Sequence, residues 1–386
     1  MLLKRSKDLT QEEYAAGIGE GLRTAFEAAK DSTGRHNRSV PVELEELKLV
    51  VFSDLHRGTG DRADDFRRCH RAYRAALGWY LEQGYELWLL GDVEELWENG
   101  IAAVMEAYEA VLEIERRFAA PAGPGLRRFF GNHDLDWSKP KHVRKHLRRW
   151  AGGAEVLESM RLQLREGGAN VGVLYFAHGH QGTPGSDEFA WIARFAVRFV
   201  WRAIQRSQGW LATTPAQSTD LRGKHDRAMF AWAKARAATE AAGERPVLIA
   251  GHTHHPVFPG EPPKRPTEQE LARLRAALGG ERDPARRAAL GAEVELMASE
   301  LWEKPYAVPR IDPPCYFNTG CGSFPDGDVT CLEISGERLQ DPELDDTADG
   351  RGKIRLMRWL DNHGKPRPHQ LAARSLREVL ASVDGR

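Results

Sequence analysis

Five short apolar runs in this sequence each end in a cluster of glycine, carboxylate, amide or imidazole groups, and this pattern constrains the fold more than any other feature. We predict strands at 47–53, 86–90, 126–130, 171–177 and 246–250. The clusters that follow them are Asp54-Leu55-His56, Gly91-Asp92, Gly131-Asn132-His133-Asp134, His178-Gly179-His180 and Gly251-His252-Thr253-His254. Helical stretches separate the runs, which is typical of an α/β fold. Because the loops at the carboxyl ends of strands in an open α/β sheet line one crevice, we expect the clusters to converge.

The residue types in these clusters favour metal binding. A strand end of the form D-x-H places both side chains on one side, so Asp54 and His56 can bind one ion. Asp92 has two carboxylate oxygens, enough to bridge two cations about 3.5–4 Å apart. We expect two divalent cations, with Mn first and Fe, Zn, Ni, Co or Mg as alternatives, because the donors are nitrogen and oxygen without thiolate. The candidate ligands are Asp54, His56, Asp92, Asn132, His178, His252 and His254.

The series resembles the pattern of the calcineurin-like metallophosphoesterase superfamily, which runs D-x-H, G-D, G-N-H-D/E, H and G-H-x-H, and the match spans residues 54–254. The resemblance implies two mixed β-sheets packed as a sandwich and flanked by helices. It implies a first metal on Asp54, His56, Asp92 and His254, and a second on Asp92, Asn132, His178 and His252. The implied activity is a metal-dependent phosphohydrolase, in which a bridging hydroxide attacks a phosphoester or pyrophosphate bond.

A narrower resemblance is to the UDP-2,3-diacylglucosamine diphosphatase branch of that superfamily. The segments Ser53-Asp54-Leu55-His56 and Gly91-Asp92-Val93-Glu94-Glu95-Leu96-Trp97 carry it, since an acidic residue and a tryptophan follow the bridging aspartate there. It implies a helical lid, here at 187–241, and a nucleotide- or lipid-linked substrate. The sequence departs from the branch by having His133 where arginine is usual, by an insertion at 259–310 and by an N-terminal extension.

Several further residues are candidates for roles beside the metals. We expect His133 to protonate the leaving group, with Asp134 fixing its tautomer. His180 and Glu95 are expected beside the metal ligands or against the substrate. Four arginines repeat every four residues on one helix, and three interpretations stay open for them: a solvated face, a lid that contacts substrate phosphates, or an interfacial helix at 189–210 that touches anionic lipid. These arginines are Arg194, Arg198, Arg202 and Arg206.

The near-zero net charge argues against an extended nucleic-acid-binding surface but does not exclude a local basic patch. The chain has 386 residues with 55 Lys and Arg against 56 Asp and Glu, a net charge of -1. Because charged residues interrupt the N-terminal stretch and no apolar run reaches about 18 residues, we expect neither a signal peptide nor a membrane-spanning helix. The four cysteines form no C-x-x-C pair, so we expect free thiols and a cytoplasmic protein, with peripheral membrane contact through 189–210 as an alternative.

The expected organisation is one catalytic domain with additions. We expect a helical extension and linker at 1–40, a core at 45–258, an inserted helical hairpin at 259–310, and the rest of the core at 311–386 with a β-hairpin and a C-terminal helix. The hairpin strands are 329–334 and 354–360. A phosphodiesterase or nuclease on the same scaffold is the main alternative function, and an inactive protein-interaction scaffold is a third.

Overall fold

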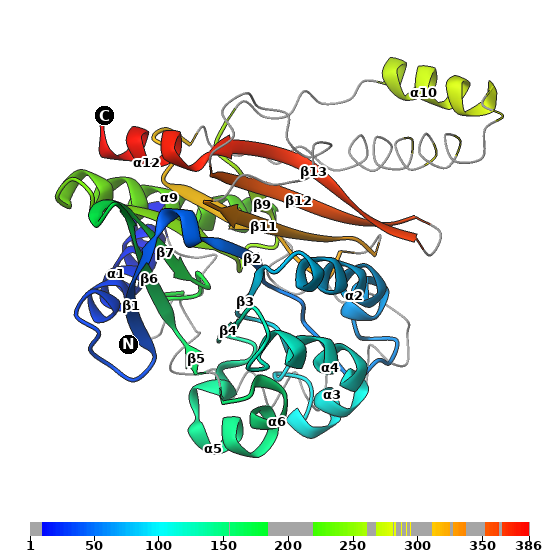
Figure 1. The fold of residues 1–386 in the computed structure, drawn as a ribbon, viewed down its shortest axis with the longest axis horizontal. Helices are drawn as coiled ribbons and strands as arrows, with labels where there is room; N and C mark the ends of the chain where they lie inside the picture. The colour runs from blue at the N-terminus through cyan, green and yellow to red at the C-terminus, as the bar shows by residue number, and fades with distance from the viewer. Residues whose placement is uncertain are drawn as a thin grey trace.

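The computed structural model describes residues 10–153, 155–183, 219–260, 268–280, 311–324, 327–336, 352–362 and 365–385, with four single residues between 282 and 294. In these ranges the chain forms an α/β structure with two mixed β-sheets (Figure 1). The six-stranded sheet has the order β1 (Asn37–Glu43), β6 (Ser159–Glu166), β7 (Ala169–Ala177), β8 (Pro246–Ala250), β10 (Tyr316–Thr319) and β9 (Pro256–Val257). The seven-stranded sheet has the order β13 (Lys365–Ser375), β12 (Lys353–Asn362), β11 (Val329–Ser335), β2 (Lys48–Phe52), β3 (Glu86–Leu90), β4 (Leu126–Phe129) and β5 (Val156–Leu157).

Side chains along β2 alternate between the two faces of the sheet, so this strand contributes to two hydrophobic clusters. Leu49 and Val51 belong to one hydrophobic cluster, while Val50 and Phe52 belong to another on the opposite face. The first cluster also contains side chains of the six-stranded sheet, such as Phe176, so the two sheets pack face to face. A strand buried on both faces reads as a continuous apolar run, which is why it is visible in the sequence.

Helices cover the outer faces of the sheets. The second cluster joins the seven-stranded sheet to α2 (Phe66–Glu82), α3 (Ile101–Ala107) and α4 (Glu109–Phe118). A basic segment follows, with the short helices α5 (Pro140–His142) and α6 (Arg148–Ala151) on either side of a π-helical turn at Val143–Leu147. Short 3₁₀ turns lie at Leu44–Glu46 and Leu135–Ser138. The remaining helices are α1 (Gln11–Lys30), α9 (Thr219–Thr239), α10 (Glu268–Gly280) and α12 (Leu376–Asp384).

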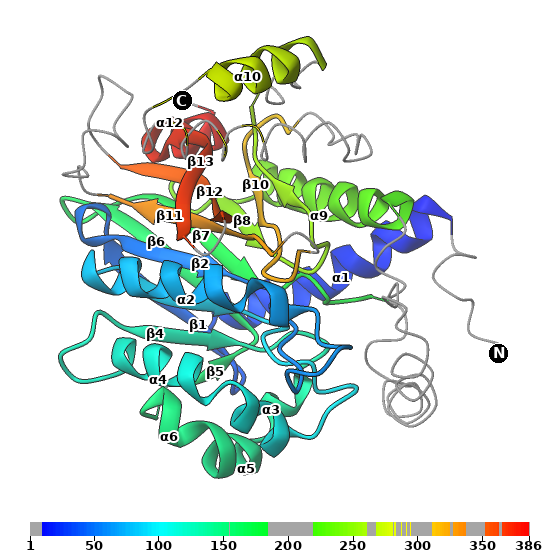
Figure 2. The ribbon, with the colours of Figure 1, turned by 90° about the vertical axis from the view of Figure 1, so that its right-hand side faces the viewer.

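Helix α1 packs into the core rather than lying beside it. It begins at Thr10, which forms a capping box with Glu13. Its buried residues recur at helical spacing; they are Tyr14, Ile18, Leu22, Ala25, Phe26 and Ala29. All of them except Ala25 belong to the cluster shared by the two sheets. Figure 2 shows α1 and α9 side by side, and this contact brings the N-terminal helix to the end of the sheet where the strand-end clusters lie.

The structure confirms the α/β class and the five strands that precede the clusters, with bounds shifted by at most two residues. The antiparallel pairing of 329–334 with 354–360 is also confirmed, by β11 and β12. The sequence did not predict β1, β5, β6, β9 or β13. Strand β1 lies largely where a linker is expected, although Asn37–Glu43 pairs in parallel with Ser159–Glu166. Strand β13 carries Pro366 and Pro368 and lies at the sheet edge, where proline is tolerated and an apolar pattern is not required.

Two predicted segments fall mainly outside the described residues. Of the lid at 187–241, the structure describes α9 and the two residues after it, so Arg194, Arg198, Arg202 and Arg206 lie outside the described part of the chain. Of the insertion at 259–310, it describes Pro259, Gly260, α10 and four single positions. None of the helices in the described ranges combines the length and apolarity needed to cross a membrane.

Candidate metal centre

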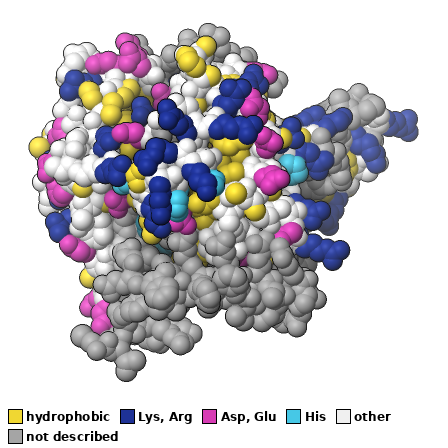
Figure 3. All heavy atoms as spheres, turned by 90° about the horizontal axis from the view of Figure 1, so that it is seen from below, with side chains coloured by type: hydrophobic (Ala, Val, Ile, Leu, Met, Phe, Trp, Pro, Cys, Tyr) yellow, Lys and Arg dark blue, Asp and Glu magenta, His cyan; other side chains and the backbone are white. Residues whose placement is uncertain are grey.

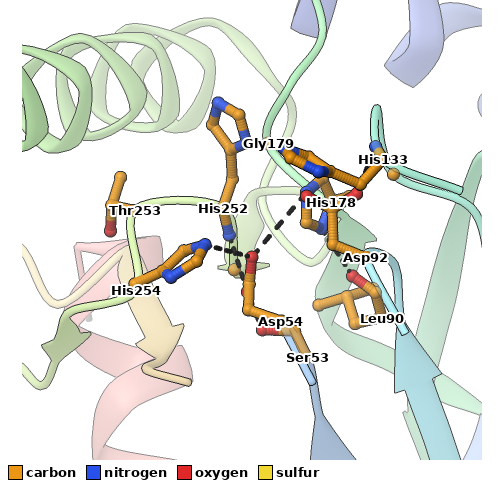
Figure 4. Close-up of polar contacts among 12 residues, drawn as sticks. Ser53, Asp54, Leu90, Asp92, His133, His178, Gly179, His252, Thr253 and His254 are labelled. Atoms are coloured by element: carbon orange, nitrogen blue, oxygen red, sulfur yellow. Dashed lines mark hydrogen bonds and ion pairs between the residues drawn. The ribbon is translucent and has the colours of Figure 1, made fainter. Parts of the chain in front are cut away.

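The strand-end clusters converge where the two sheets meet, as the sequence predicts. Strands β2, β3 and β4 run parallel in one sheet and β7 and β8 run parallel in the other, so each group ends on one side. Backbone hydrogen bonds tie the loops together: the Asp54 amide donates to the Gly91 carbonyl oxygen at 3.1 Å, and the Gly251 amide to the His178 carbonyl oxygen at 3.0 Å. Figure 4 shows the side chains of Asp54, Asp92, His178 and His254 pointing toward one another from these loops.

One group of side chains contains Asp54, His56 and His254, whose ligand atoms all lie within 4.8 Å of one another. His254 Nε2 is 3.3 Å from Asp54 Oδ1, and His56 Nε2 is 3.9 Å from the same oxygen. The two imidazole Nε2 atoms are 3.0 Å apart. Nitrogen and oxygen donors at these separations can hold a divalent cation.

A second group contains Asp92, His178 and His252. His178 Nε2 lies 3.1 Å from Asp92 Oδ2, while His178 Nδ1 is 2.8 Å from the Leu90 carbonyl oxygen. Because a carbonyl only accepts, Nδ1 carries a proton, and Nε2 is the atom that faces the site and could give its lone pair to a cation. A third grouping joins His56, Asp92 and His133, so Asp92 lies between the two sets.

Three of the expected ligand atoms are buried and form no hydrogen bond of good geometry, although two of them lie within ion-pair distance of another expected ligand. They are Asp54 Oδ1, Asn132 Oδ1 and His178 Nε2. Buried polar atoms normally find a partner, because leaving one unpaired costs about 1–3 kcal/mol. The donor atoms of this site therefore fit divalent cations, whose coordination would satisfy all three.

The backbone is strained at the same residues. In the described part of the chain, six residues other than glycine have a positive φ, and five of them are expected ligands. These five are Asp54 (52°), His56 (48°), Asp92 (50°), His252 (70°) and His254 (56°). Each such residue costs about 1–3 kcal/mol, and strain of this kind persists at functional sites where the surrounding structure enforces it.

Glycine is required where these loops approach one another. A Cβ atom on Gly91 would lie 2.6 Å from His178 Nδ1, and Gly91 has a φ of +87°. A Cβ atom on Gly131 would lie 2.7 Å from His178 Nε2 and would overlap Asp92 Oδ1. Each glycine thus leaves the space that the His178 ring occupies.

The electrostatics of the site favour bound positive charge. Burial alone would raise the pKa of Asp92, but the imidazoles of His178 and His133 outweigh it and hold this pKa well below its usual value. Burial also works to lower the pKa values of His56 and His178, yet the carboxylates around them raise these to about 10 and about 9. The carboxylates therefore draw protons to the two rings, and a metal ion would displace those protons.

Glu95 links the two histidines nearest to it. Its Oε2 lies 2.6 Å from His133 Nδ1 and 3.0 Å from His56 Nδ1, and Oε1 accepts from the Trp97 amide at 3.1 Å. The Trp97 ring stacks on His133 with centroids 4.2 Å apart, and its Nε1 donates to the Asn132 carbonyl oxygen at 2.6 Å. Although burial opposes it, the carboxylates of Glu95 and Asp92 raise the pKa of His133.

The expectation that Asp134 fixes the His133 tautomer is wrong, because Glu95 occupies that position. The Asp134 carboxylate instead accepts from the backbone amides of Gly131 at 2.7 Å, Val93 at 2.9 Å and Asp92 at 3.2 Å. Burial, together with the charges of Asp92 and Glu94, raises the pKa of Asp134 to about 7. Asp134 therefore holds the two glycine-containing turns together and does not contact the ring of His133.

His180 lies beside the second group, with its ring centroid 5.4 Å from that of His178. It is buried, and burial lowers its pKa to about 3, so it is neutral at physiological pH. Its Nδ1 has no hydrogen-bond partner. The position agrees with the expectation of a residue beside the metal ligands.

Helix α9 contributes two residues whose role the sequence did not predict. His225 Nε2 is 2.7 Å from the Gly179 carbonyl oxygen, and Asp226 Oδ1 accepts from Thr253 Oγ1 at 3.0 Å and from the Tyr316 hydroxyl at 2.6 Å. Both residues thus bind loops that carry expected ligands. No local sequence pattern indicates that these two residues contact the loops. Once the helix is placed, two adjacent polar residues on its buried face indicate that they have polar partners there.

A basic surface was also missed. Segment 139–149 starts shortly after His133, and its lysines and arginines are exposed; they are Lys139, Lys141, Arg144, Lys145, Arg148 and Arg149. Lys139 pairs with Asp136 at 2.8 Å and Arg149 with Glu109 at 2.9 Å. On the face seen in Figure 3, Lys and Arg side chains gather around histidines over α5 and α6. The neutral overall charge therefore conceals a local basic surface.

No protein-family model matches this chain, and no curated protein matches it either.

Proposed function

We propose that the protein is a metal-dependent phosphohydrolase of the calcineurin-like metallophosphoesterase type. The observation that carries the proposal is the convergence of buried or half-buried nitrogen and oxygen donors, five of them on residues with a strained backbone, in one site. The sequence pattern from Asp54 to His254 supports it, as does the arrangement of two mixed sheets with the site at the carboxyl ends of their parallel strands. The substrate that we propose is a phosphoester or pyrophosphate, nucleotide- or lipid-linked.

Two divalent cations fit the donor set. Asp54, His56, Asp92 and His254 would hold one, and Asp92, Asn132, His178 and His252 would hold the other. When bound, such cations lower the pKa of water and neutralise charge on phosphoryl oxygens. The rest of the chemistry comes from the side chains of this chain.

His133 is suited to donate a proton to the leaving oxygen. Because Glu95 binds Nδ1, the Nε2 atom is the one that can exchange a proton with a substrate. Although burial opposes it, the carboxylates of Glu95 and Asp92 raise the pKa of His133, which favours the protonated ring that a general acid requires. Stacking on Trp97 fixes the plane of the ring.

A substrate panel tests the proposal. Protein stripped with chelator and reloaded with Mn²⁺ is assayed on a phosphomonoester, a phosphodiester, a UDP-sugar pyrophosphate and a cyclic nucleotide. We expect hydrolysis of at least one substrate that disappears on chelation, and a fall of at least about 100-fold in Asp92→Asn, which loses the bridging carboxylate. Equal activity in Asp92→Asn and wild type would overturn the proposal. Activity confined to the diester or the cyclic nucleotide would favour the phosphodiesterase alternative.

A further inference from the structure

The N-terminal helix reaches the candidate metal centre through one buried hydrogen bond. The hydroxyl of Tyr14 on α1 lies 2.8 Å from Nδ1 of His225 on α9, and both side chains are buried. The two residues are 211 positions apart in the sequence. Figure 2 shows the two helices running past each other at this end of the molecule.

The direction of this hydrogen bond follows from the next one. His225 Nε2 is 2.7 Å from the Gly179 carbonyl oxygen, which can only accept, so Nε2 carries the proton. The neutral ring then has its lone pair on Nδ1, and the Tyr14 hydroxyl donates to it. Tyr14 thus selects the tautomer of His225 that binds the Gly179 carbonyl.

His225 contacts one half of the candidate metal centre. Gly179 lies between His178 and His180, and its carbonyl belongs to the peptide that joins it to His180, so the hydrogen bond from His225 fixes the loop one residue after His178. The His225 ring also packs against the His252 ring, with centroids 4.7 Å apart. His178 and His252 form a group with Asp92, whereas His56 and His254 form a group with Asp54.

Helix α1 also approaches the His178 loop directly. A Cβ atom on Gly17 would lie 3.0 Å from the Gly182 carbonyl oxygen, and one on Gly21 would overlap the backbone of Gln181 and Gly182. The Gln181 side chain in turn accepts from the Gly179 amide at 3.0 Å. The helix and the loop therefore touch backbone to backbone, which leaves the loop little freedom to move.

We propose that Tyr14 and His225 are positioning residues that hold His178 and His252 in place, and that the N-terminal helix thereby sets the metal affinity of one of the two groups. The inference rests on the proposed function, because it requires that the groups bind metal. According to this inference, the N-terminal helix positions two of the expected metal ligands and is therefore part of the functional site. Residues that hold a ligand in this way typically change metal affinity by about 10–100-fold.

The test is a Mn²⁺ titration of the full chain after chelation, followed by calorimetry and by electron paramagnetic resonance. For wild type we expect two Mn²⁺ ions per chain. In Tyr14→Phe we expect one ion bound as in wild type and the other weakened by roughly 10–100-fold. The matched control is Tyr80→Phe, which also removes a buried hydroxyl, one that donates to Glu333 at 2.7 Å on the other side of the seven-stranded sheet. The control should keep both affinities.

A pair of substitutions at His225 separates positioning from general packing. His225→Gln keeps an amide that can donate to the Gly179 carbonyl, whereas His225→Leu does not. We therefore expect His225→Gln to bind the more weakly held Mn²⁺ ion with higher affinity than His225→Leu does. This pair also serves if Tyr14→Phe fails to fold. If Tyr14→Phe and His225→Leu bind both ions with wild-type affinity, the inference is overturned but the proposed function is not. The same holds if the variants weaken the binding of both ions equally. A wild-type chain that binds no Mn²⁺ would overturn the proposed function and the inference together.

Discussion

Replacing Glu95 by glutamine tests whether one carboxylate couples a metal ligand to the proton donor. Glu95 Oε2 accepts from both His56 and His133, at 3.0 and 2.6 Å, and Oε1 accepts from the Trp97 amide at 3.1 Å. All three partners are donors toward this residue, but glutamine has only one accepting oxygen. The amide group must therefore face a donor whichever way the side chain turns, and the negative charge is lost as well.

The magnitude follows from these contacts. A hydrogen bond to a charged group contributes about 1.5–3 kcal/mol, and each 1.36 kcal/mol corresponds to about a tenfold change. We therefore expect Glu95→Gln to lower kcat/KM by roughly 10–100-fold. The Glu95 carboxylate is among the groups that raise the pKa of His133, so its loss lowers that pKa. Because a general acid loses activity as pH rises through its pKa, the basic limb of the pH profile should move to lower pH.

The assay is kcat/KM between pH 5 and 10 on a substrate with a poor leaving group, with metal content measured on the same samples. Asp136→Asn is the matched control, because Asp136 lies in the same loop region and pairs with Lys139 and His142 rather than with His133. A rate that falls equally at every pH, with the basic limb unmoved, would refute the coupling.

Three further predictions address the turns, the close packing and the thiols. Asp134→Ala should lower the free energy of unfolding by at least about 2 kcal/mol in denaturant titrations, since three buried backbone amides lose their acceptor; an unchanged midpoint would contradict this structural role. Gly131→Ala should reduce Mn²⁺ binding at least tenfold with little change in the far-ultraviolet circular dichroism, because the new methyl group meets Asp92 and His178; full binding would show that the loops can separate. The four cysteines are buried, and burial raises the pKa values of Cys315 and Cys321 to about 12. The native protein should therefore show almost no reaction with a thiol reagent at pH 8, while the unfolded chain should show four reactive thiols. Rapid reaction of the native protein would contradict the burial of the cysteines.

The sequence predicts this site well where local pattern and chemistry coincide. Strands β2 and β3 are buried on both faces, so they appear as apolar runs, and the polar residues after them are conspicuous. The convergence of Asp54, Asp92, His178 and His254 then follows from the general geometry of parallel strands.

The features that the sequence did not predict depend on long-range contacts or on backbone groups. Asp134 binds three backbone amides, which carry no side-chain signature, so the neighbouring His133 looked like its natural partner. Glu95 reaches His133 across 38 positions and His225 reaches Tyr14 across 211. A strand such as β13 has no apolar alternation to reveal it, because it lies at a sheet edge and is largely half-buried or exposed.

The central claim is that the strand-end cluster is a metal centre, and metal stoichiometry tests it most directly. Wild type and Asp92→Asn, each stripped and reloaded with Mn²⁺, are freed of excess metal and measured by elemental analysis at known protein concentration. We expect two ions per chain in wild type and fewer than two in Asp92→Asn, because Asp92 lies between the two groups of donors. Wild-type protein that retains no metal, or an Asp92→Asn variant that retains as much as wild type, would contradict it.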